Sequence, residues 1–294
     1  MTFGDGAAIA AVRFWRRQEV PGRAQLLVLI ALSGAGGCSS SADAEKMADP
    51  RVRYEAALEA MIDGNFTEAA TEFETVLGST LNPALTQLAT LRLGDALFFQ
   101  GKHAEAAEVY REFLEQFPRS PDAPHARYMR GLSFMRRMPE DSWIMPPAES
   151  RETTDVDAAY AALVELVERH PDSFYALRAR ALLAQCIERQ CRHDLYVARF
   201  YEGRDNPAAV VQRVRQAVAR EEREKKAGHL PGWALCAESR GSLLMAAEAY
   251  AALGDEAGLG WVRERYVEHQ GEYSSPEAGL EEIDRMIGGE EEEE

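Results

Sequence analysis

The sequence is short of positive charge, and this shortage excludes two classes of partner. Lys and Arg number 33 against 49 Asp and Glu, which gives a formal net charge of −16. Nucleic acid is therefore not an expected partner, because its phosphates require a basic footprint. Attraction to anionic lipid headgroups is excluded on the same ground. The apolar run Leu26–Leu32 falls far short of the ~20 residues of a transmembrane helix, so membrane attachment requires a lipid or a short apolar segment.

Cysteine is scarce, and its spacing argues against disulfides and zinc. The four cysteines are Cys38, Cys186, Cys191 and Cys236, and no CxxC pair occurs. Cys186 and Cys191 lie on one predicted helix, about 7.5 Å apart along its axis, which exceeds the ~7 Å Cα separation that a disulfide spans. We expect Cys186, Cys191 and Cys236 to be ordinary helix-packing residues.

Catalytic motifs are missing as well. The sequence contains no nucleophile elbow, HExxH, P-loop or GxGxxG pattern. His170, His193 and His229 have no cysteine or carboxylate at ligand spacing, and most acidic residues lie on the outer faces of predicted helices. We therefore expect no enzymatic activity, no cofactor and no metal.

The sequence does contain an internal repeat. A set of small and apolar residues recurs at an offset of 37 (101 − 64): Ala57, Gly64, Phe66, Ala69, Phe73 and Val76 match Gly94, Gly101, His103, Ala106, Tyr110 and Phe113. Glycine at the turn, with small and aromatic residues at helical spacing on either side, is typical of tetratricopeptide repeats, helix–turn–helix units of about 34 residues. Because one unit cannot bury its own apolar faces, further copies are expected on both sides.

The pattern continues with lower regularity. The third repeat opens at Tyr128–Leu132, and its second helix ends at Pro171. The fourth begins at Phe174, after which the phase shifts and 192–202 reads as one more helix. Another helix follows Asn206, a favourable N-cap before proline. The charged stretch 219–229 is expected to be a solvated helix extension or linker, and 238–270 a last helical pair.

The predicted fold is all-α, a tetratricopeptide-repeat superhelical solenoid of about five helix pairs over residues 51–287. Early repeats span 51–173 and later repeats 174–270. The tail, 288–294, ends in a run of glutamates that repel one another, so it is expected to be disordered.

The N-terminal residues resemble an export signal. Four arginines precede Leu26–Leu32, and small residues then lead to Cys38, so we interpret 1–37 as a secretory signal peptide and 38–50 as a flexible tether. Small residues followed by Cys38 resemble a bacterial lipobox, which implies that Cys38 is lipidated after cleavage. An ordinary cleaved signal with an incidental cysteine remains the alternative, and Arg16–Arg17 admits a twin-arginine signal.

An insertion, 138–154, interrupts the third repeat. It has three prolines and no apolar period, so it is a long loop. Its apolar residues Trp143, Ile144 and Met145 either fold back onto the solenoid or form a docking knob for a partner.

Three stretches resemble the BamD family of outer-membrane assembly lipoproteins. They are Tyr128–Leu132, the insertion followed by Asp172-Ser173, and the pair 192–202 and 209–214. The resemblance implies a lipid-anchored scaffold on the outer membrane that faces the periplasm. It would bind the periplasmic domains of the barrel-forming subunit BamA, other assembly lipoproteins and unfolded outer-membrane proteins. The chain departs from the family at Arg151–Thr153, and at Asp205 and Pro207, where the family has a glycine and an aromatic residue.

The resemblance assigns two sets of candidate residues. The later repeats would contact BamA through Arg213, with Arg192, His193 and Tyr196 on the preceding helix. The earlier repeats would form a groove for unfolded substrate, with the candidates Phe98, Phe99, Arg127, Arg130 and Trp143. The alternatives are core packing for the phenylalanines, and surface charge or helix capping for the polar residues. An alternative function is that of a tetratricopeptide lipoprotein serving cell-wall or cell-division complexes.

Overall fold

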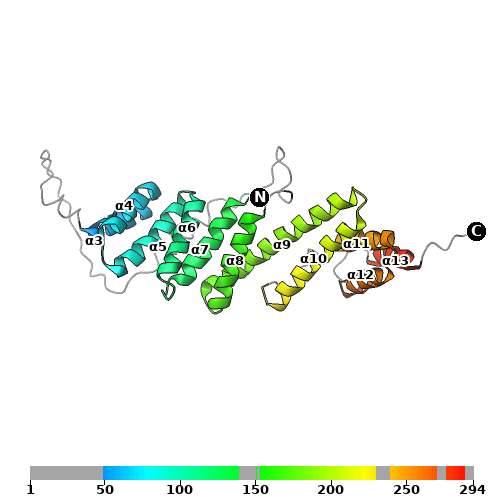
Figure 1. Ribbon diagram of the computed structural model, residues 1–294. Coiled ribbons are helices and arrows are strands. Elements are labelled where there is room, and N and C mark those ends of the chain that lie inside the picture. The colour runs from blue at the N-terminus through cyan, green and yellow to red at the C-terminus, as the bar shows by residue number, and fades with distance from the viewer. Residues whose placement is uncertain (1–48, 139–149, 151–152, 230–238, 270–275, 289–294) are drawn as a thin grey trace, which may run out of the picture. The chain divides into compact units, whose positions relative to one another are not determined.

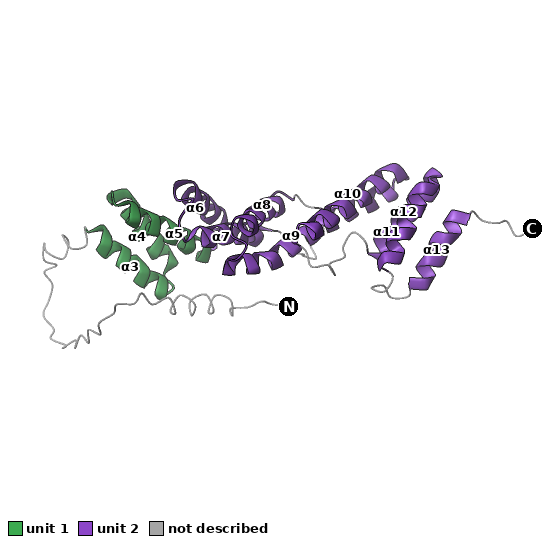
Figure 2. Ribbon diagram, turned by 90° about the horizontal axis from the view of Figure 1, so that it is seen from below, with its two compact units in different colours: residues 1–100 green, residues 101–294 purple. Residues whose placement is uncertain are grey.

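The computed structural model describes residues 49–138, 150, 153–229, 239–269 and 276–288, and within them the assigned elements are eleven α-helices (Figure 1). The all-α expectation is confirmed. The signal peptide, Cys38, Trp143 and the glutamate tail lie outside the described residues. Clustering of contacts divides the chain into two compact units, 1–100 and 101–294 (Figure 2).

The first unit contains α3 (Pro50–Ile62), α4 (Phe66–Ser79) and α5 (Pro83–Phe99), each packed against the next. Helix α5 begins as its sequence dictates, because Asn82 accepts a hydrogen bond from the backbone N–H of Ala84 and Pro83 occupies the first turn. The tight turn between α3 and α4 places Gly64 at φ +80°, a conformation that glycine adopts without steric cost.

The second unit begins with α6 (His103–Gln116), α7 (Ala123–Arg137) and α8 (Thr154–Arg169). Its first turn places Gly101 at φ +81°, matching Gly64. Three pairs of residues at the predicted offset are fully buried in both repeats: Ala69 and Ala106, Phe73 and Tyr110, Val76 and Phe113. The predicted repeat register is therefore confirmed in these two repeats.

The third repeat keeps the same frame. Leu163 of α8 is fully buried against Gly131 of α7, where an added Cβ would lie 2.7 Å from the Leu163 side chain. Helices α6 and α8 also end alike, with Phe117 at φ −126°, ψ 55° and His170 at φ −138°, ψ 56°. Each of these residues immediately precedes the predicted terminal proline.

Helix α9 (Phe174–Glu202) corrects the sequence interpretation. Residues 174–187 and 192–202 form one helix of 29 residues, which Ser173 caps by accepting from the backbone N–H of Ala176. No glycine or proline interrupts this stretch, and buried residues recur along it at helical spacing: Leu183, Ile187, Cys191, Asp194 and Ala198. The apolar periodicity shifts along α9 because the helix packs against more than one neighbour, and not because the helix is interrupted.

Helix α10 (Pro207–Lys226) packs alongside α9 (Figure 1). Asn206 caps it as predicted, accepting from the backbone N–H of Ala209. The charged 219–229 stretch extends this helix to Lys226, as one of the two predicted alternatives has it, but it is not solvated throughout, because Glu221, Glu224 and His229 are buried. Each of these three side chains has a polar partner, and this pairing offsets the desolvation of its charge.

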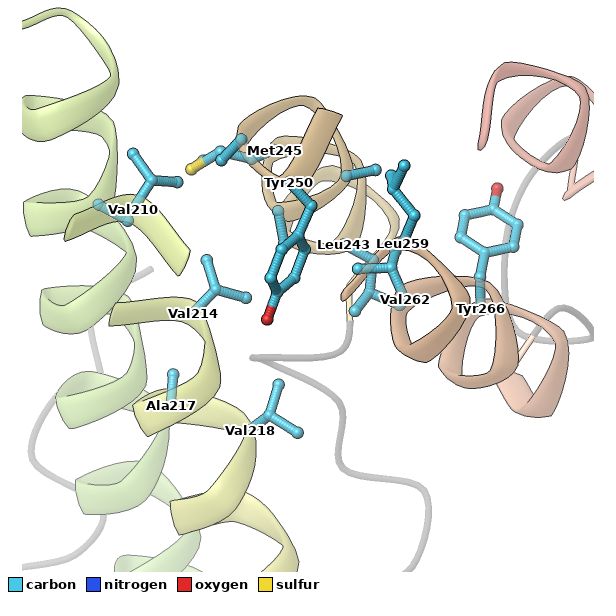
Figure 3. Close-up of a cluster of buried hydrophobic side chains, with 14 of the residues drawn as sticks. Val210, Val214, Ala217, Val218, Leu243, Met245, Tyr250, Leu259, Val262 and Tyr266 are labelled. Atoms are coloured by element: carbon cyan, nitrogen blue, oxygen red, sulfur yellow. The ribbon is translucent and has the colours of Figure 1, made fainter. Parts of the chain in front are cut away.

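The chain continues with α11 (Arg240–Leu253), α12 (Glu256–His269) and α13 (Pro276–Gly288). Tyr250 lies in repeat register as expected, and Figure 3 shows it facing the valines of α10 across a shared apolar core. Helix α13 was not predicted. It contributes only Gly279 and Ile283 to the buried set, and its other positions are mostly acidic or partly exposed.

The two described helical cysteines pack as expected. Cys186 and Cys191 are free and buried, and burial raises the pKa of the Cys186 thiol to about 12. Cys236 lies outside the described residues. None of the described helices has the length and apolarity needed to cross a bilayer.

Candidate partner-binding site

A polar pocket of about 200 Å³ lies among α8, α9 and α10, and it brings together two predicted partner contacts, Arg213 and His193. Three further charged side chains line it: Asp157 from α8, Asp194 from α9 and Arg220 from α10. Arg213 and Arg220 are seven residues apart on α10 and therefore share one face of that helix. All three helices belong to the second unit.

Asp194 is the buried centre of this pocket. Its side chain is 5% exposed, and its carboxylate lies between two guanidinium groups: Arg213 Nη1 is 3.8 Å from Oδ1, and Arg220 Nη1 is 3.1 Å from Oδ2. Burial raises the pKa of Asp194, although Arg220, Arg213 and His193 act in the opposite direction. Oδ2 is buried without a correctly oriented hydrogen-bond donor among the described residues. The ion pairs therefore compensate only part of the desolvation of this carboxylate.

Asp157, the second carboxylate, is held by neutral groups. Gln190 Nε2 donates to its Oδ1 at 2.5 Å, and Thr153 Oγ1 donates to its Oδ2 at 3.2 Å. These bonds tie the start of α8 to the middle of α9. Asp157 is thereby occupied without either arginine, so the two guanidinium groups have Asp194 as their acidic neighbour in the pocket.

Both arginines retain free donor capacity. The Arg213 side chain is 36% exposed and that of Arg220 is 22% exposed. Within the described part of the chain, the structure gives neither guanidinium a contact to an acceptor other than Asp194. Since a guanidinium presents a planar fork of N–H donors suited to carboxylates, the pocket can accept an acidic group from outside.

Arg192 and Tyr196 lie on α9 but do not line this pocket. Arg192 pairs with Glu188 one turn earlier, at 2.5 Å between exposed side chains. Tyr196 is exposed, and so is Phe200 one turn later, with the Arg204 guanidinium 3.9 Å from the Phe200 ring centroid. Sequence reasoning missed Phe200, although its spacing of four from Tyr196 already placed both aromatic rings on one face.

In the first unit, the two groove candidates Phe98 and Phe99 take part in packing. Phe98 is buried, and the Phe99 ring stacks on Phe66 with centroids 5.2 Å apart. An open hollow of about 670 Å³ lies at the start of α4, where Phe66 and Gln100 line it, but neither candidate does. The core-packing alternative therefore describes the position of both phenylalanines.

The arginine groove candidates lie on α7. Arg127 is buried, so the alternative that it is a solvated charge is wrong. Its Nη1 is 3.2 Å from His170 Nε2 and its Nε is 3.3 Å from Glu165 Oε1. Burial and Arg127 together lower the pKa of His170. Arg130 is partly buried, with its guanidinium 5.8 Å from the ring centroid of Phe134.

A second polar cluster, missed by sequence reasoning, joins α8 to the end of α10. Tyr160 Oη donates to Glu224 Oε1 at 2.7 Å, and His229 Nδ1 lies 2.8 Å from Glu224 Oε2. Burial and Glu224 raise the pKa of Tyr160, so its hydroxyl remains a donor at neutral pH. His229 thus has a carboxylate partner five residues away in the sequence, and the sequence pattern did not predict this contact. Among the described residues, no group of three or more His, Cys, Asp or Glu could hold a metal ion.

Comparison with known proteins places this pocket within a family match. Residues 46–228 match the YfiO family, described as outer membrane lipoprotein. Proteins named outer membrane protein assembly factor BamD are similar: that of Haemophilus influenzae is 28% identical over 182 residues, 60% of this chain and 69% of that one. The Vibrio cholerae protein of the same name is 28% identical over 191 residues, covering 64% of this chain and 79% of that one.

A solved structure of TPR-like repeats from Podosopora anserina has a TM-score of 0.37 and 17% identity, covering 76% of this chain and 97% of that one. The family match spans α3 to α10 and includes each residue of the pocket. The chain therefore belongs to the YfiO family of outer membrane lipoproteins.

Proposed function

We propose that this chain is a non-enzymatic scaffold of the machinery that assembles β-barrel proteins in the outer membrane. It binds the periplasmic domains of the barrel-forming subunit through α9 and α10, and it holds unfolded barrel segments on its earlier repeats. The lipid on Cys38 anchors it to the outer membrane with the solenoid facing the periplasm. The names of its relatives support the assembly role, and stacked helix pairs suit the binding of extended partners.

One observation carries the partner assignment: a partly exposed Arg213 with unused donors, at the edge of a pocket inside the family match. Arginine is favoured at interfaces because its fork pairs with carboxylates and its plane stacks on aromatic rings. The exposed Tyr196 and Phe200 add aromatic surface on the neighbouring helix. Charge and aromatic area together are typical of an interface with a folded partner.

The test is a pull-down of the lipidated protein from detergent-solubilised membranes. Wild type is expected to recover a large barrel protein with repeated periplasmic domains, and Arg213→Glu is expected to recover at most about a tenth as much, because one desolvated charge pair contributes 1.4 kcal/mol or more. Arg119→Glu is the matched control, since Arg119 is exposed in the turn after α6. Recovery of cell-wall or division proteins instead would favour the alternative function.

The lipid anchor has a separate test. Cys38→Ser removes the thiol that would carry the acyl chains, so the protein is expected in the soluble periplasmic fraction, because acyl chains supply the membrane affinity. The experiment is done in cells depleted of the barrel-forming subunit, which could otherwise retain the protein. Membrane association of Cys38→Ser in those cells would contradict the anchor.

A further inference from the structure

We propose that the face of α11 and α12 beneath α13 is a binding groove for an amphipathic helix of a partner protein, and that α13 occupies this groove in the free chain. The partner helix carries a small residue, then a lysine or arginine three positions later and a branched aliphatic residue four positions later. This surface does not include the pocket around Arg213. The inference therefore adds a second binding surface to the scaffold and does not depend on the first.

The groove is the place where a further repeat would stack. Helix α12 approaches α11 through Gly258, where an added Cβ would overlap the ring of Tyr250. Helix α13 approaches α12 in the same way, through Gly279, where an added Cβ would overlap the hydroxyl of Tyr266 (Figure 3). Because each unit of a repeat protein is covered by the next, the end of the array leaves a face that one more helix can cover.

Helix α13 is held by few groups. It buries two residues, Gly279 and Ile283, whereas α12 buries four. Two more of its side chains are partly buried, Leu280 and Met286. Its ion pair joins Arg263 Nε to Asp284 Oδ1 at 2.5 Å, but both side chains are nearly half exposed, so the pair adds little. Helix α13 can therefore leave the groove without unfolding α11 and α12.

The charge at one position of α13 is unfavourable. Glu282 lies near Glu248 of α11, and Glu202 at the end of α9 lies near it as well. Burial raises the pKa of Glu248, and the charges of Glu202 and Glu282 raise it further. Among the described residues, the structure gives none of these three carboxylates an ion pair. A helix with a cation at the position of Glu282 is therefore expected to bind better than α13 does.

This charge also distinguishes a partner from a second copy of the chain. The α13 helix of another copy carries the same glutamate, so it gains nothing over the helix already in place. A partner helix with a lysine or arginine there replaces repulsion by attraction. The partner is therefore the occupant that displaces α13.

The direct test uses full-length protein in the Cys38→Ser background, which keeps acyl chains and detergent out of the assay. The probe is a fluorescein-labelled peptide of residues 276–288, followed by anisotropy. Gly279→Leu places a side chain where Tyr266 lies, so it releases α13 and is expected to bind the peptide at least about tenfold more tightly than the parent protein, in which α13 competes. Ala278→Leu, at an exposed position of α13, is the control and is expected to bind like the parent.

Ile283→Asp releases α13 by a second route, because it places a charge at the one fully buried side chain of that helix. If neither Gly279→Leu nor Ile283→Asp binds the peptide more tightly than Ala278→Leu, the groove is overturned. Hydrogen exchange of the α11 and α12 amides is measured in both variants. Loss of their protection in both would show that α13 is an integral part of the fold, and it would overturn the proposal as well.

The charge preference has its own test. A peptide with Glu282→Lys is expected to bind the Gly279→Leu protein about threefold more tightly than the unchanged peptide. Glu281→Lys alters the net charge of the peptide equally at an exposed position, so it is the control. An equal gain from both peptides would reduce the effect to net charge and overturn the cation requirement.

Light scattering tests the remaining occupant, a second copy of the chain. The parent protein is expected to stay monomeric as its concentration rises. A dimer that Gly279→Leu abolishes would show that the groove takes α13 of another copy, and it would overturn the partner assignment.

Discussion

The packing of the regular repeats and the packing of α9 against α10 differ in the chemistry of what they bury. In α4, α6 and α8 the buried faces are alanine, leucine, valine and aromatic rings. On α9 and α10 the buried set also includes the carboxylates Asp194, Glu221 and Glu224. An apolar seam is stabilised by area alone, whereas a polar seam is stable only when each charge keeps a partner. The regular repeats therefore provide an apolar framework, and the polar seam contains the residues proposed to contact a partner.

The largest expected effect tests the apolar side of this comparison. Ala106 is fully buried in α6, so Ala106→Leu overpacks the repeat and is expected to lower the free energy of unfolding by about 1–3 kcal/mol. Ala104→Leu, at an exposed position of the same helix, is the matched control and is expected to change little. Urea unfolding followed by circular dichroism measures both, and equal stabilities would show that the repeat register is wrong.

The next effect tests the polar side. Tyr160→Phe removes the donor to Glu224 Oε1 and leaves a buried carboxylate oxygen without it. The free energy of unfolding is expected to fall by about 1–2 kcal/mol. Tyr196→Phe removes an exposed hydroxyl instead, so it is expected to have no measurable effect on stability. If both variants unfold at the same urea concentration as wild type, the polar seam does not depend on pairing.

A smaller effect, of opposite sign, concerns the turn that joins the two helices of the polar seam. Asp205 has φ 54°, and it is the one non-glycine residue with positive φ among those described. Asp205→Gly relieves this conformation and is expected to raise the free energy of unfolding by about 0.5–1 kcal/mol. Glycine is also what the resemblance to the BamD family places there. A loss of stability would mean that the Asp205 side chain has a stabilising role of its own.

The smallest effect is a pH dependence. Burial raises the pKa of Asp194, so the folded state takes up a proton at a higher pH than the unfolded state does. Its stability contribution therefore increases as the pH falls toward the raised pKa and is lost as the pH rises through it. Unfolding of wild type and Asp194→Asn is compared at about pH 7 and about pH 5. The difference is expected to shift in favour of wild type at the lower pH, and a constant difference would contradict the assignment.

Sequence reasoning succeeded where burial is apolar and periodic. The offset of 37 located Gly64 and Gly101 at their turns and the buried alanine and aromatic positions of two repeats. It failed at 219–229, where a run of charges resembles a solvated face unless the partner side chains are known. Tyr160 lies 64 residues before Glu224 in the chain, so local spacing contains no sign of their contact.

The candidate site shows the same limit. Arg213 and His193 were identified through the family resemblance, and their proximity follows from the pairing of α9 with α10. Asp194 and Arg220 were missed, because a single aspartate or arginine on a helix is usually solvated and nothing local marks it as buried. The break that was wrongly predicted in α9 has a related cause: a change of packing neighbour alters the apolar phase as a loop would.

The continuity of α9 has a mechanical consequence. A helix of 29 residues is a rod about 43 Å long, and its hydrogen-bonded backbone contains no glycine or proline at which to bend. It packs against α7 and α8 and also against α10. A force applied at Asp194 is therefore transmitted along the axis toward Ser173 without being absorbed by a hinge. The continuous helix keeps the pocket at a fixed distance from the third repeat. A displacement of one end of α9 therefore moves the other end as well.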